Sequence, residues 1–229
     1  MTLPAPATTP TPSPTLDARN LMVDGQLRPN KVTDKRVLAA MRRLPREAFL
    51  PAVSRPLAYV DNDVPVLPGR GMLAPVAIAR LVQALAPQPG QTALVLGASY
   101  GAALLAALDL SVIALEDDAA MADLARAGFA AAGLAVDLRI GPLAPGLPEA
   151  APFDLILVDG GVSRLPALAL QLRIDPPGRL AAVLCPPGRR EGVATLAERA
   201  GAALAARPLF DCAATCLPAC RASAAFHFA

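Results

Sequence analysis

The sequence predicts an α/β fold, with a mostly parallel sheet of about seven strands and helices on both faces. Short apolar runs alternate with helix-like segments from residue 92 to residue 200. The runs are apolar throughout, which is typical of strands covered on both sides. A glycine loop at 97–101 follows the first run, and Glu116 ends the second run, nineteen residues past Gly97. These observations predict parallel strands whose carboxyl ends share one edge, where ligands of such sheets bind.

The first third of the chain predicts helices joined by irregular structure. Apolar residues at helical spacing indicate a helix over 34–41, which Pro45 ends. Prolines and glycines interrupt residues 46–81, so we expect irregular structure that lies over the domain until a helix begins near Pro75. Pro75 suits the first turn of that helix, 76–85, because an N–H at this position would have no partner inside the helix.

The repeating α/β pattern accounts for the rest of the chain. Buried strands are expected at 92–96, 111–115, 136–140, 154–158 and 179–184. Helices are expected at 102–108, 119–132, 165–172 and 191–200, and Gly133 and Gly201 are placed to end the second and the last of these. The segments 202–209 and 222–228 are expected to close the sheet as two further strands.

The length of 229 residues suits one domain with a short extension. Residues 1–18 are rich in proline and threonine and are expected to form a disordered leader. Residues 19–229 are expected to form a single domain, with a helical and irregular cover over 19–86 and an α/β core over 87–229.

The composition excludes several functional classes. The 21 basic and 19 acidic residues are spread along the chain, so no dense basic face for nucleic acid is expected. No apolar stretch reaches the roughly 18 residues that cross a bilayer, and the first eighteen residues lack a signal-peptide pattern. We therefore expect a cytoplasmic protein without a membrane or nucleic-acid partner.

The cysteines raise the question of a metal site. Cys212, Cys216 and Cys220 are evenly spaced, but Pro218 interrupts any helix that would align them and the chain has a single histidine. Their spacing is not a common zinc pattern. We expect thiols in a reducing compartment and no metal, and the role of these three residues stays open.

The expected carboxyl ends of the strands carry Gly97, Glu116, Gly141 and Asp159. Glycine lets a backbone approach a ligand closely, and a carboxylate at the tip of the second strand can accept hydrogen bonds from ribose hydroxyls. The spacing from Gly97 favours Glu116 as a ribose ligand, with a solvated acid at a helix start as the alternative.

The residues beside these four allow more than one role. Asp117 and Asp118 either cap the next helix or reach the ribose or adenine edge. Tyr100 either stacks on a base or covers the end of the sheet. Ser99 and Asp159 are expected to be mainly structural, although Asp159 is also a candidate for a new polar role.

Four segments in a fixed order carry a resemblance to a known family. They are MVDGQLRP at 22–29 with the helix and PREAF that follow, the stretch 58–71, GPLAPGLPE running into PFD at 141–154, and PGRL at 177–180. This ordered set, covering about 20–184, resembles the protein-L-isoaspartate O-methyltransferases. The resemblance implies a Rossmann-like, S-adenosylmethionine-dependent methyltransferase fold.

The resemblance also implies an activity and a cofactor. Members of the family transfer a methyl group from S-adenosylmethionine to the isoaspartyl carboxylate of damaged proteins and so begin their repair. Such a nucleophile is already ionised at neutral pH, so the near absence of histidine does not argue against activity. The expected partner is a damaged protein or peptide, or an unknown protein partner.

The chain departs from the family pattern at four places. Val95 replaces an acid that lies near the cofactor amino group, and Ser99 replaces the middle glycine of the loop. Pro142 replaces an aspartate that holds the adenine. The hydroxyls that face the substrate carboxylate are replaced by Met72, Leu73 and Ala74, although Pro75 is retained.

The resemblance implies roles for particular residues of this chain. Substrate contacts fall to Met72 and Ala74. The resemblance and the positions at the strand ends together give the candidate cofactor contacts Gly97, Ser99, Gly101, Glu116, Asp117, Gly141 and Asp159, although the family usually has no acid at the position of Asp159. The favoured function is a protein carboxyl methyltransferase, and the alternative is a catalytically inactive homologue that acts as a binding or scaffolding module.

Overall fold

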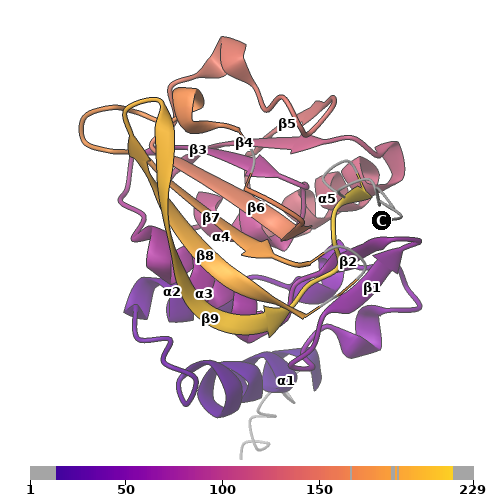
Figure 1. Cartoon of the computed structure of the whole chain (residues 1–229). Coiled ribbons are helices and arrows are strands. Elements are labelled where there is room, and N and C mark those ends of the chain that lie inside the picture. The colour runs from indigo at the N-terminus through magenta and orange to yellow at the C-terminus, as the bar shows by residue number, and fades with distance from the viewer. Residues whose placement is uncertain (1–13, 166, 187–188, 190, 219–229) are drawn as a thin grey trace, which may run out of the picture.

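The computed structural model describes residues 14–165, 167–186, 189 and 191–218. Its main sheet has seven strands in the order β5-β4-β3-β6-β7-β8-β9 (Figure 1). The first five strands in this order run parallel, and β8 and β9 follow as an antiparallel pair beside β7. The structure thus confirms the predicted mostly parallel, Rossmann-like sheet.

The core elements follow the sequence pattern closely. The strands are β3 (Thr92–Leu96), β4 (Ser111–Glu116), β5 (Asp137–Ile140), β6 (Leu155–Val162), β7 (Arg179–Leu184), β8 (Glu191–Ala200) and β9 (Ala203–Ala213). Helix α4 (Tyr100–Ala106) joins β3 to β4, and α5 (Ala119–Ala132) joins β4 to β5. Gly133 ends α5 in the left-handed region at φ 65°, as its position predicts.

The cover consists of helices and a hairpin. Helix α1 (Pro14–Met22) continues into a π-helical turn, η1 (Val23–Leu27), and is followed by α2 (Lys35–Arg43) and α3 (Pro75–Leu85). Two 3₁₀ turns, η2 (Arg46–Phe49) and η3 (Arg55–Leu57), lie between α2 and an antiparallel hairpin of β1 (Val64–Leu67) and β2 (Arg70–Met72). The sequence analysis expected irregular structure here and did not predict the hairpin.

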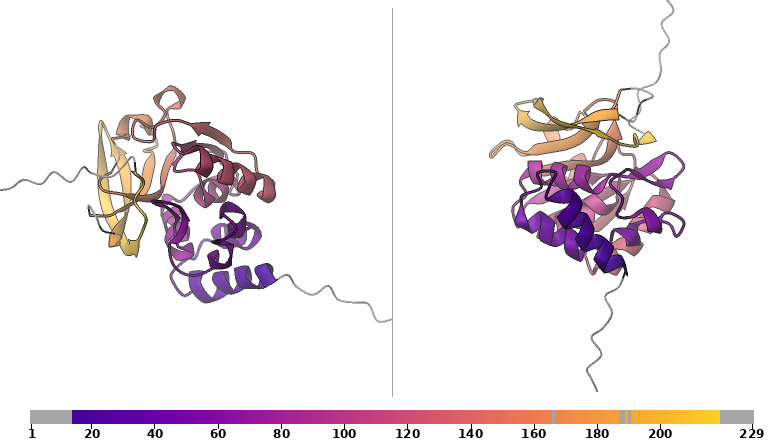
Figure 2. Two further views of the ribbon diagram at one scale, coloured as in Figure 1. Left: turned by 90° about the vertical axis from the view of Figure 1, so that its right-hand side faces the viewer. Right: turned by 90° about the horizontal axis from the view of Figure 1, so that it is seen from below.

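The two faces of the sheet are covered differently. Val95 and Leu157 point to the face of the sheet that is packed by residues of the α-helices. The N-terminal helices lie together on one side of the C-terminal strands (Figure 2). The cluster on the opposite face draws its buried residues from strands and loops instead, including Leu143, Phe153 and Leu217. Among the described residues between β5 and β7, the helical elements are the single 3₁₀ turns η4 (Pro148–Ala150) and η5 (Ala169–Gln171). Helices on both faces were expected, and on this second face they are reduced to these turns.

Two predicted helices differ in the structure. Residues 191–200 form strand β8, not a helix, because Ala194–Ala197 are buried consecutively between β7 and β9. Continuous burial suits a strand inside a sheet, and this context overrides the helix propensity of Ala, Glu and Arg. The predicted helix at 165–172 is present only as η5, whose Gln171 side chain bonds the 145–147 loop.

The ends of the chain complete the comparison. Helix α1 already begins at Pro14, so the last residues of the expected 1–18 leader are helical, and 1–13 lie outside the described residues. The strand predicted at 222–228 also lies outside them, and β9 extends four residues beyond the predicted end of the segment at 202–209. In the part of the chain that the structure describes, no helix is long and apolar enough to cross a bilayer.

Candidate functional site

Glu116 ends β4 at the carboxyl edge of the sheet and is completely buried. Its Oε2 accepts hydrogen bonds from the Arg70 guanidinium at 2.6 Å and from the Ala98 N–H at 2.9 Å. Its Oε1 accepts from the N–H groups of Asp117 and Asp118 at 3.0 and 3.1 Å. The carboxylate therefore has four donors from the chain itself. Burial raises the pKa of Glu116, and the Arg70 charge opposes that rise.

Arg70 reaches this site from β2 and joins two carboxylates. Besides Glu116, it donates to Asp117 Oδ1 at 2.9 Å, and only 4% of its side chain is exposed. Burial lowers the pKa of Arg70, but the two carboxylates outweigh burial and raise the pKa above its usual value. The guanidinium is thus a permanent cation that covers Glu116. Neither the bond from Arg70 to Glu116 nor the hairpin that carries Arg70 was predicted from the sequence.

Gly97 begins the loop after β3 and adopts φ 82°, a conformation that favours glycine. A Cβ atom there would lie 3.3 Å from the Asp159 carbonyl oxygen and 3.3 Å from a methyl carbon of Leu217. The next glycine, Gly101, lies in the first turn of α4, and a Cβ there would be 2.7 Å from Asp159 Oδ2. Both glycines are therefore needed for close packing of the chain at the strand ends.

Asp159 lies in β6 with 3% of its surface exposed. Its Oδ2 accepts from the Ser99 hydroxyl at 2.6 Å and from the Gly101 N–H at 2.7 Å, and so holds the start of α4. Its Oδ1 has no hydrogen-bond partner among the described residues. Burial raises the pKa of Asp159, against these two hydrogen bonds. The structure brings Ser99, Gly101 and Asp159 together, although the sequence analysis proposed no contact between them.

Tyr100 belongs to the helical core and does not face the open edge of the sheet. Its ring is fully buried and packs edge-on against Phe49 at 5.7 Å between centroids. The Arg46 guanidinium lies over the same ring, 4.6 Å from its centroid. Of the two roles considered for Tyr100, the structure supports packing over the sheet and not stacking on a base.

A short C-terminal segment, residues 214–217, lies beside the loop. Gly161 donates to the Thr215 carbonyl at 2.9 Å and accepts from the Leu217 N–H at 2.8 Å, which makes an isolated bridge to β6. The Leu217 side chain fills the space beside Gly97 and Gly160, where a Cβ on Gly160 would come within 2.9 Å of it. Leu217 therefore packs on the glycines at the ends of both strands. No motif in the sequence pointed to it.

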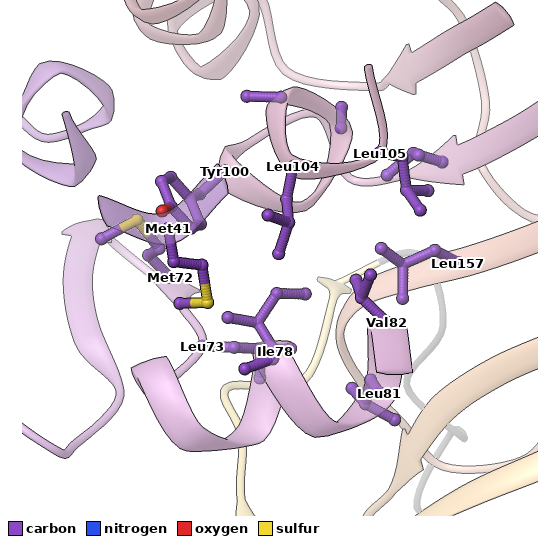
Figure 3. Close-up of a cluster of buried hydrophobic side chains, with 14 of the residues drawn as sticks. Met41, Met72, Leu73, Ile78, Leu81, Val82, Tyr100, Leu104, Leu105 and Leu157 are labelled. Carbon is purple, nitrogen blue, oxygen red and sulfur yellow. The ribbon is translucent and has the colours of Figure 1, made fainter. Parts of the chain in front are cut away.

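The predicted substrate segment connects β2 to α3. The Met72 and Leu73 side chains point into the helical core beside Met41, Ile78 and Tyr100 (Figure 3), so contact with a substrate would fall to the backbone of these two residues. Ala74 is half-buried at the start of α3 and supplies no side-chain cap. Arg46 holds this segment in place, because the Leu73 carbonyl accepts a hydrogen bond from Arg46 Nη2 at 2.9 Å.

The remaining candidates occupy simpler positions. Asp118 caps α5 by accepting from the N–H groups of Ala120 and Met121, which confirms the capping role for this acid. The N–H of Gly141 donates to the Glu116 carbonyl at 2.9 Å, and a Cβ at Gly141 would make only an ordinary contact of 3.5 Å. The described residues include no cluster of three metal-ligating side chains, and Cys185, Cys212 and Cys216 are thiols.

The fold and the residues at the edge of the sheet indicate the class of protein. A parallel sheet with a glycine loop after its first strand and an acid ending the second is the arrangement of the Rossmann-like methyltransferases. A solved structure named protein-L-isoaspartate O-methyltransferase aligns with a TM-score of 0.73 at 21% identity, covering 87% of this chain and 65% of that one. A Plasmodium falciparum protein assigned to the same enzyme, solved with S-adenosyl-L-homocysteine, aligns with a TM-score of 0.71 at 18% identity, covering 88% of this chain and 98% of that one. At these identities the likeness concerns the fold.

Sequence relatives then fix the family. The family model for protein-L-isoaspartate(D-aspartate) O-methyltransferase matches residues 18–209. A protein-L-isoaspartate O-methyltransferase of Methylorubrum extorquens is 44% identical over 75% of this chain and 76% of its own length. The corresponding enzyme of Methylorubrum populi is 43% identical over 75% of this chain and 81% of its own length. The chain belongs to the protein-L-isoaspartate O-methyltransferase family of S-adenosylmethionine-dependent enzymes.

Some residues at the strand ends fit S-adenosylmethionine as they stand, and Glu116 fits it only after Arg70 has moved. The φ of Gly97 would allow a close backbone approach, and Asp159 Oδ1 and Arg46 Nη1 are buried polar atoms without partners among the described residues. Glu116 ends β4, where a ribose would lie, but Arg70 donates to its Oε2. Binding of a ribose to Glu116 therefore requires Arg70 to move away from that oxygen.

Proposed function

We propose that this chain transfers a methyl group from S-adenosylmethionine to the carboxylate of an isoaspartyl residue in a damaged protein or peptide. The relationship to the family carries the proposal, because the match extends over the cover, the glycine loop and most of the sheet. The geometry of the carboxyl edge supports it, since Gly97 and Glu116 meet there through the Ala98 N–H.

The residues we assign to the cofactor are Gly97, Ser99, Gly101, Glu116, Asp117, Gly141 and Asp159. Glu116 would hold the ribose, and the 97–101 loop would approach the part of the cofactor that carries sulfur. Met72 and Ala74 would position the substrate carboxylate through their backbone, at the start of α3. The Arg46 bond to Leu73 fixes this segment relative to the loop that begins α4.

The reaction asks little of side-chain chemistry. Bound S-adenosylmethionine would supply a methyl group on a positively charged sulfur. A carboxylate with an ordinary pKa of about 4 is already an anion at neutral pH and needs no general base. Transfer of this methyl group would join the methyl carbon to the carboxylate oxygen and break the carbon–sulfur bond, which would leave the sulfur as a neutral thioether. The chain contributes by holding oxygen, carbon and sulfur in line.

Two measurements test this function. Calorimetric titration with S-adenosylmethionine and S-adenosylhomocysteine is expected to give micromolar binding. Methyl-ester formation is then expected on an isoaspartyl peptide and not on the same peptide with ordinary aspartate. Absence of binding at millimolar ligand would reject the proposal and favour a scaffolding homologue, and binding without ester formation would reject the substrate.

A further inference from the structure

Arg46 is an unusual buried cation. It is completely buried, and no salt bridge to it occurs among the described residues. Its Nε donates to the Ala58 carbonyl and its Nη2 to the Leu73 carbonyl, each at 2.9 Å, but its Nη1 has no partner in the part of the chain that the structure describes. An unpartnered charged donor in the interior is costly, so a group that accepts from Nη1 would stabilise this site.

Asp159 is its counterpart on the same face of the sheet. Leu157 and Val95 are register partners that pack on the helical face. Asp159 lies on that face too, because a Cβ on Gly101 would meet both Asp159 Oδ2, at 2.7 Å, and a methyl carbon of Leu157, at 2.9 Å. Its Oδ2 is satisfied by Ser99 and Gly101, and its Oδ1 is not. Arg46 and Asp159 influence each other electrostatically, and the Asp63 carboxylate influences both, but no hydrogen bond between described atoms joins Arg46 to Asp159.

Both residues border the glycine loop. Asp159 holds Ser99 and Gly101, and the Arg46 guanidinium lies over the Tyr100 ring in the same loop. The opposite side of the loop, at Ala98, donates to Glu116. A ligand extended across this loop would thus place one end at Glu116 and its other end at the two charged residues.

Asp159 Oδ1 and Arg46 Nη1 together favour a ligand group that carries both a positive and a negative charge. Asp159 Oδ1 can only accept, and Arg46 Nη1 can only donate. A group with an ammonium beside a carboxylate, such as a free α-amino acid end, satisfies both at once, whereas a neutral group satisfies them less strongly. Both atoms are buried, so entry of such a group requires the cover to open.

We infer that Asp159 and Arg46 bind the α-ammonium and the α-carboxylate of the amino-acid end of the cofactor. This inference rests on the proposed function. Asp159, in β6, would then accept from the cofactor ammonium, which Val95 in the neighbouring strand cannot do because its side chain is apolar. It also gives the buried Arg46 a binding role beyond its hold on Leu73.

The test compares two ligands that differ only in this end. S-adenosylhomocysteine has the amino-acid group, and 5′-methylthioadenosine lacks it. Asp159→Asn keeps an oxygen for Ser99 and Gly101 but presents an amide donor where Oδ1 was. We expect the Kd for S-adenosylhomocysteine to rise at least roughly tenfold, with the Kd for methylthioadenosine within about twofold of wild type.

Two further variants sharpen the result. Asp154→Asn, directly before the first residue of β6, is the matched control and is expected to leave both affinities unchanged. Arg46→Lys retains the charge without the planar fork and is expected to weaken S-adenosylhomocysteine selectively. If this variant does not fold, Asp159→Asn still decides the question.

The outcomes separate this inference from the proposed function. Equal effects of Asp159→Asn on both ligands would overturn it, because they would assign a buried water or a structural role to the two charges. Wild-type binding of methylthioadenosine that is as tight as that of S-adenosylhomocysteine would overturn it while leaving a nucleoside site. No binding of either ligand would overturn both proposals.

Discussion

The two buried acids at the strand ends, Glu116 and Asp159, differ in how far the chain satisfies them. Glu116 has four donors, three of them backbone N–H groups and one the Arg70 guanidinium. Asp159 has two donors, both on one oxygen, and the other oxygen has no partner among the described residues. A ligand must therefore compete with the protein at Glu116 but meets an unpaired acceptor at Asp159. Burial of an acid alone does not show whether it is available to a ligand.

Removing Glu116 should have the largest effect. Glu116→Ala leaves the Arg70 cation buried without its main partner and removes the acceptor of three N–H groups. We expect the free energy of unfolding to fall by about 3–5 kcal/mol, measured by urea denaturation.

Asp117→Ala is the control for that variant. It removes the other carboxylate bound to Arg70, but this one is partly exposed, and its loss should cost no more than about 1 kcal/mol. Equal losses from the two variants would mean that the four donors of Glu116 contribute little to stability.

Gly97 lies between the two acids and offers a sharper measurement. Gly97→Ala places a side chain at φ 82° and brings its Cβ to 3.3 Å from the Asp159 carbonyl and from Leu217. We expect a loss of about 2 kcal/mol in thermal or urea unfolding. Gly133→Ala has φ 65° with no neighbouring atom within 4 Å, so it isolates the backbone cost. If the two variants lose the same stability, crowding at the strand ends is unimportant.

Arg70 tests competition at Glu116 directly. Arg70→Met keeps an apolar stem and removes the guanidinium, so a ribose no longer has to displace a charge-assisted hydrogen bond. We expect methylthioadenosine to bind roughly tenfold more tightly, measured by calorimetry. Arg80→Met is the control, since Arg80 stacks on Phe210 at 3.7 Å and does not contact Glu116. Weaker binding to the Arg70 variant would show that the guanidinium assists the ligand.

The sequence predicted the parallel core well because its signals are local. The strand at 92–96, the helix at 119–132 and the strand at 179–184 have the same limits in the structure. The strand at 191–200 was missed because its state depends on burial between two neighbouring strands, which Ala- and Glu-rich sequence does not reveal.

The positions of residues at the edge of the sheet were predicted only where spacing along the chain carries information. Gly97 directly follows β3 and Glu116 ends β4, so the order of elements places them at one edge. Arg70 and Leu217 reach the same edge from segments that are distant in sequence, and nothing local marks their destination. The PREAF segment contributed to the family resemblance, but neither spacing nor composition indicates that its Arg46 is completely buried.

The pH dependence of stability is the most specific test of the difference between the two acids. Burial raises the folded-state pKa of Asp159 above the roughly 3.9 of an unfolded chain. The folded state then binds more protons, so the contribution of this group is complete below about pH 3.9 and is lost as pH rises through the folded pKa. The Asp159→Asn variant lacks this loss. Its unfolding free energy relative to wild type should therefore increase between about pH 4 and pH 7, as measured by urea titration.

Asp154 should show the opposite slope and serves as the control. Burial opposes the change, but hydrogen bonds from Arg173 and Thr92 outweigh it and lower the pKa of Asp154. Its contribution is present above about pH 3.9 and is lost as pH falls through the folded pKa, so Asp154→Asn should lose stability relative to wild type as pH rises. Parallel slopes for the two variants would contradict the assignment of Asp159 as a poorly satisfied acid. An ammonium paired with Oδ1 would lower the pKa of Asp159, so saturating S-adenosylhomocysteine should flatten the Asp159-dependent slope, whereas methylthioadenosine should leave it unchanged.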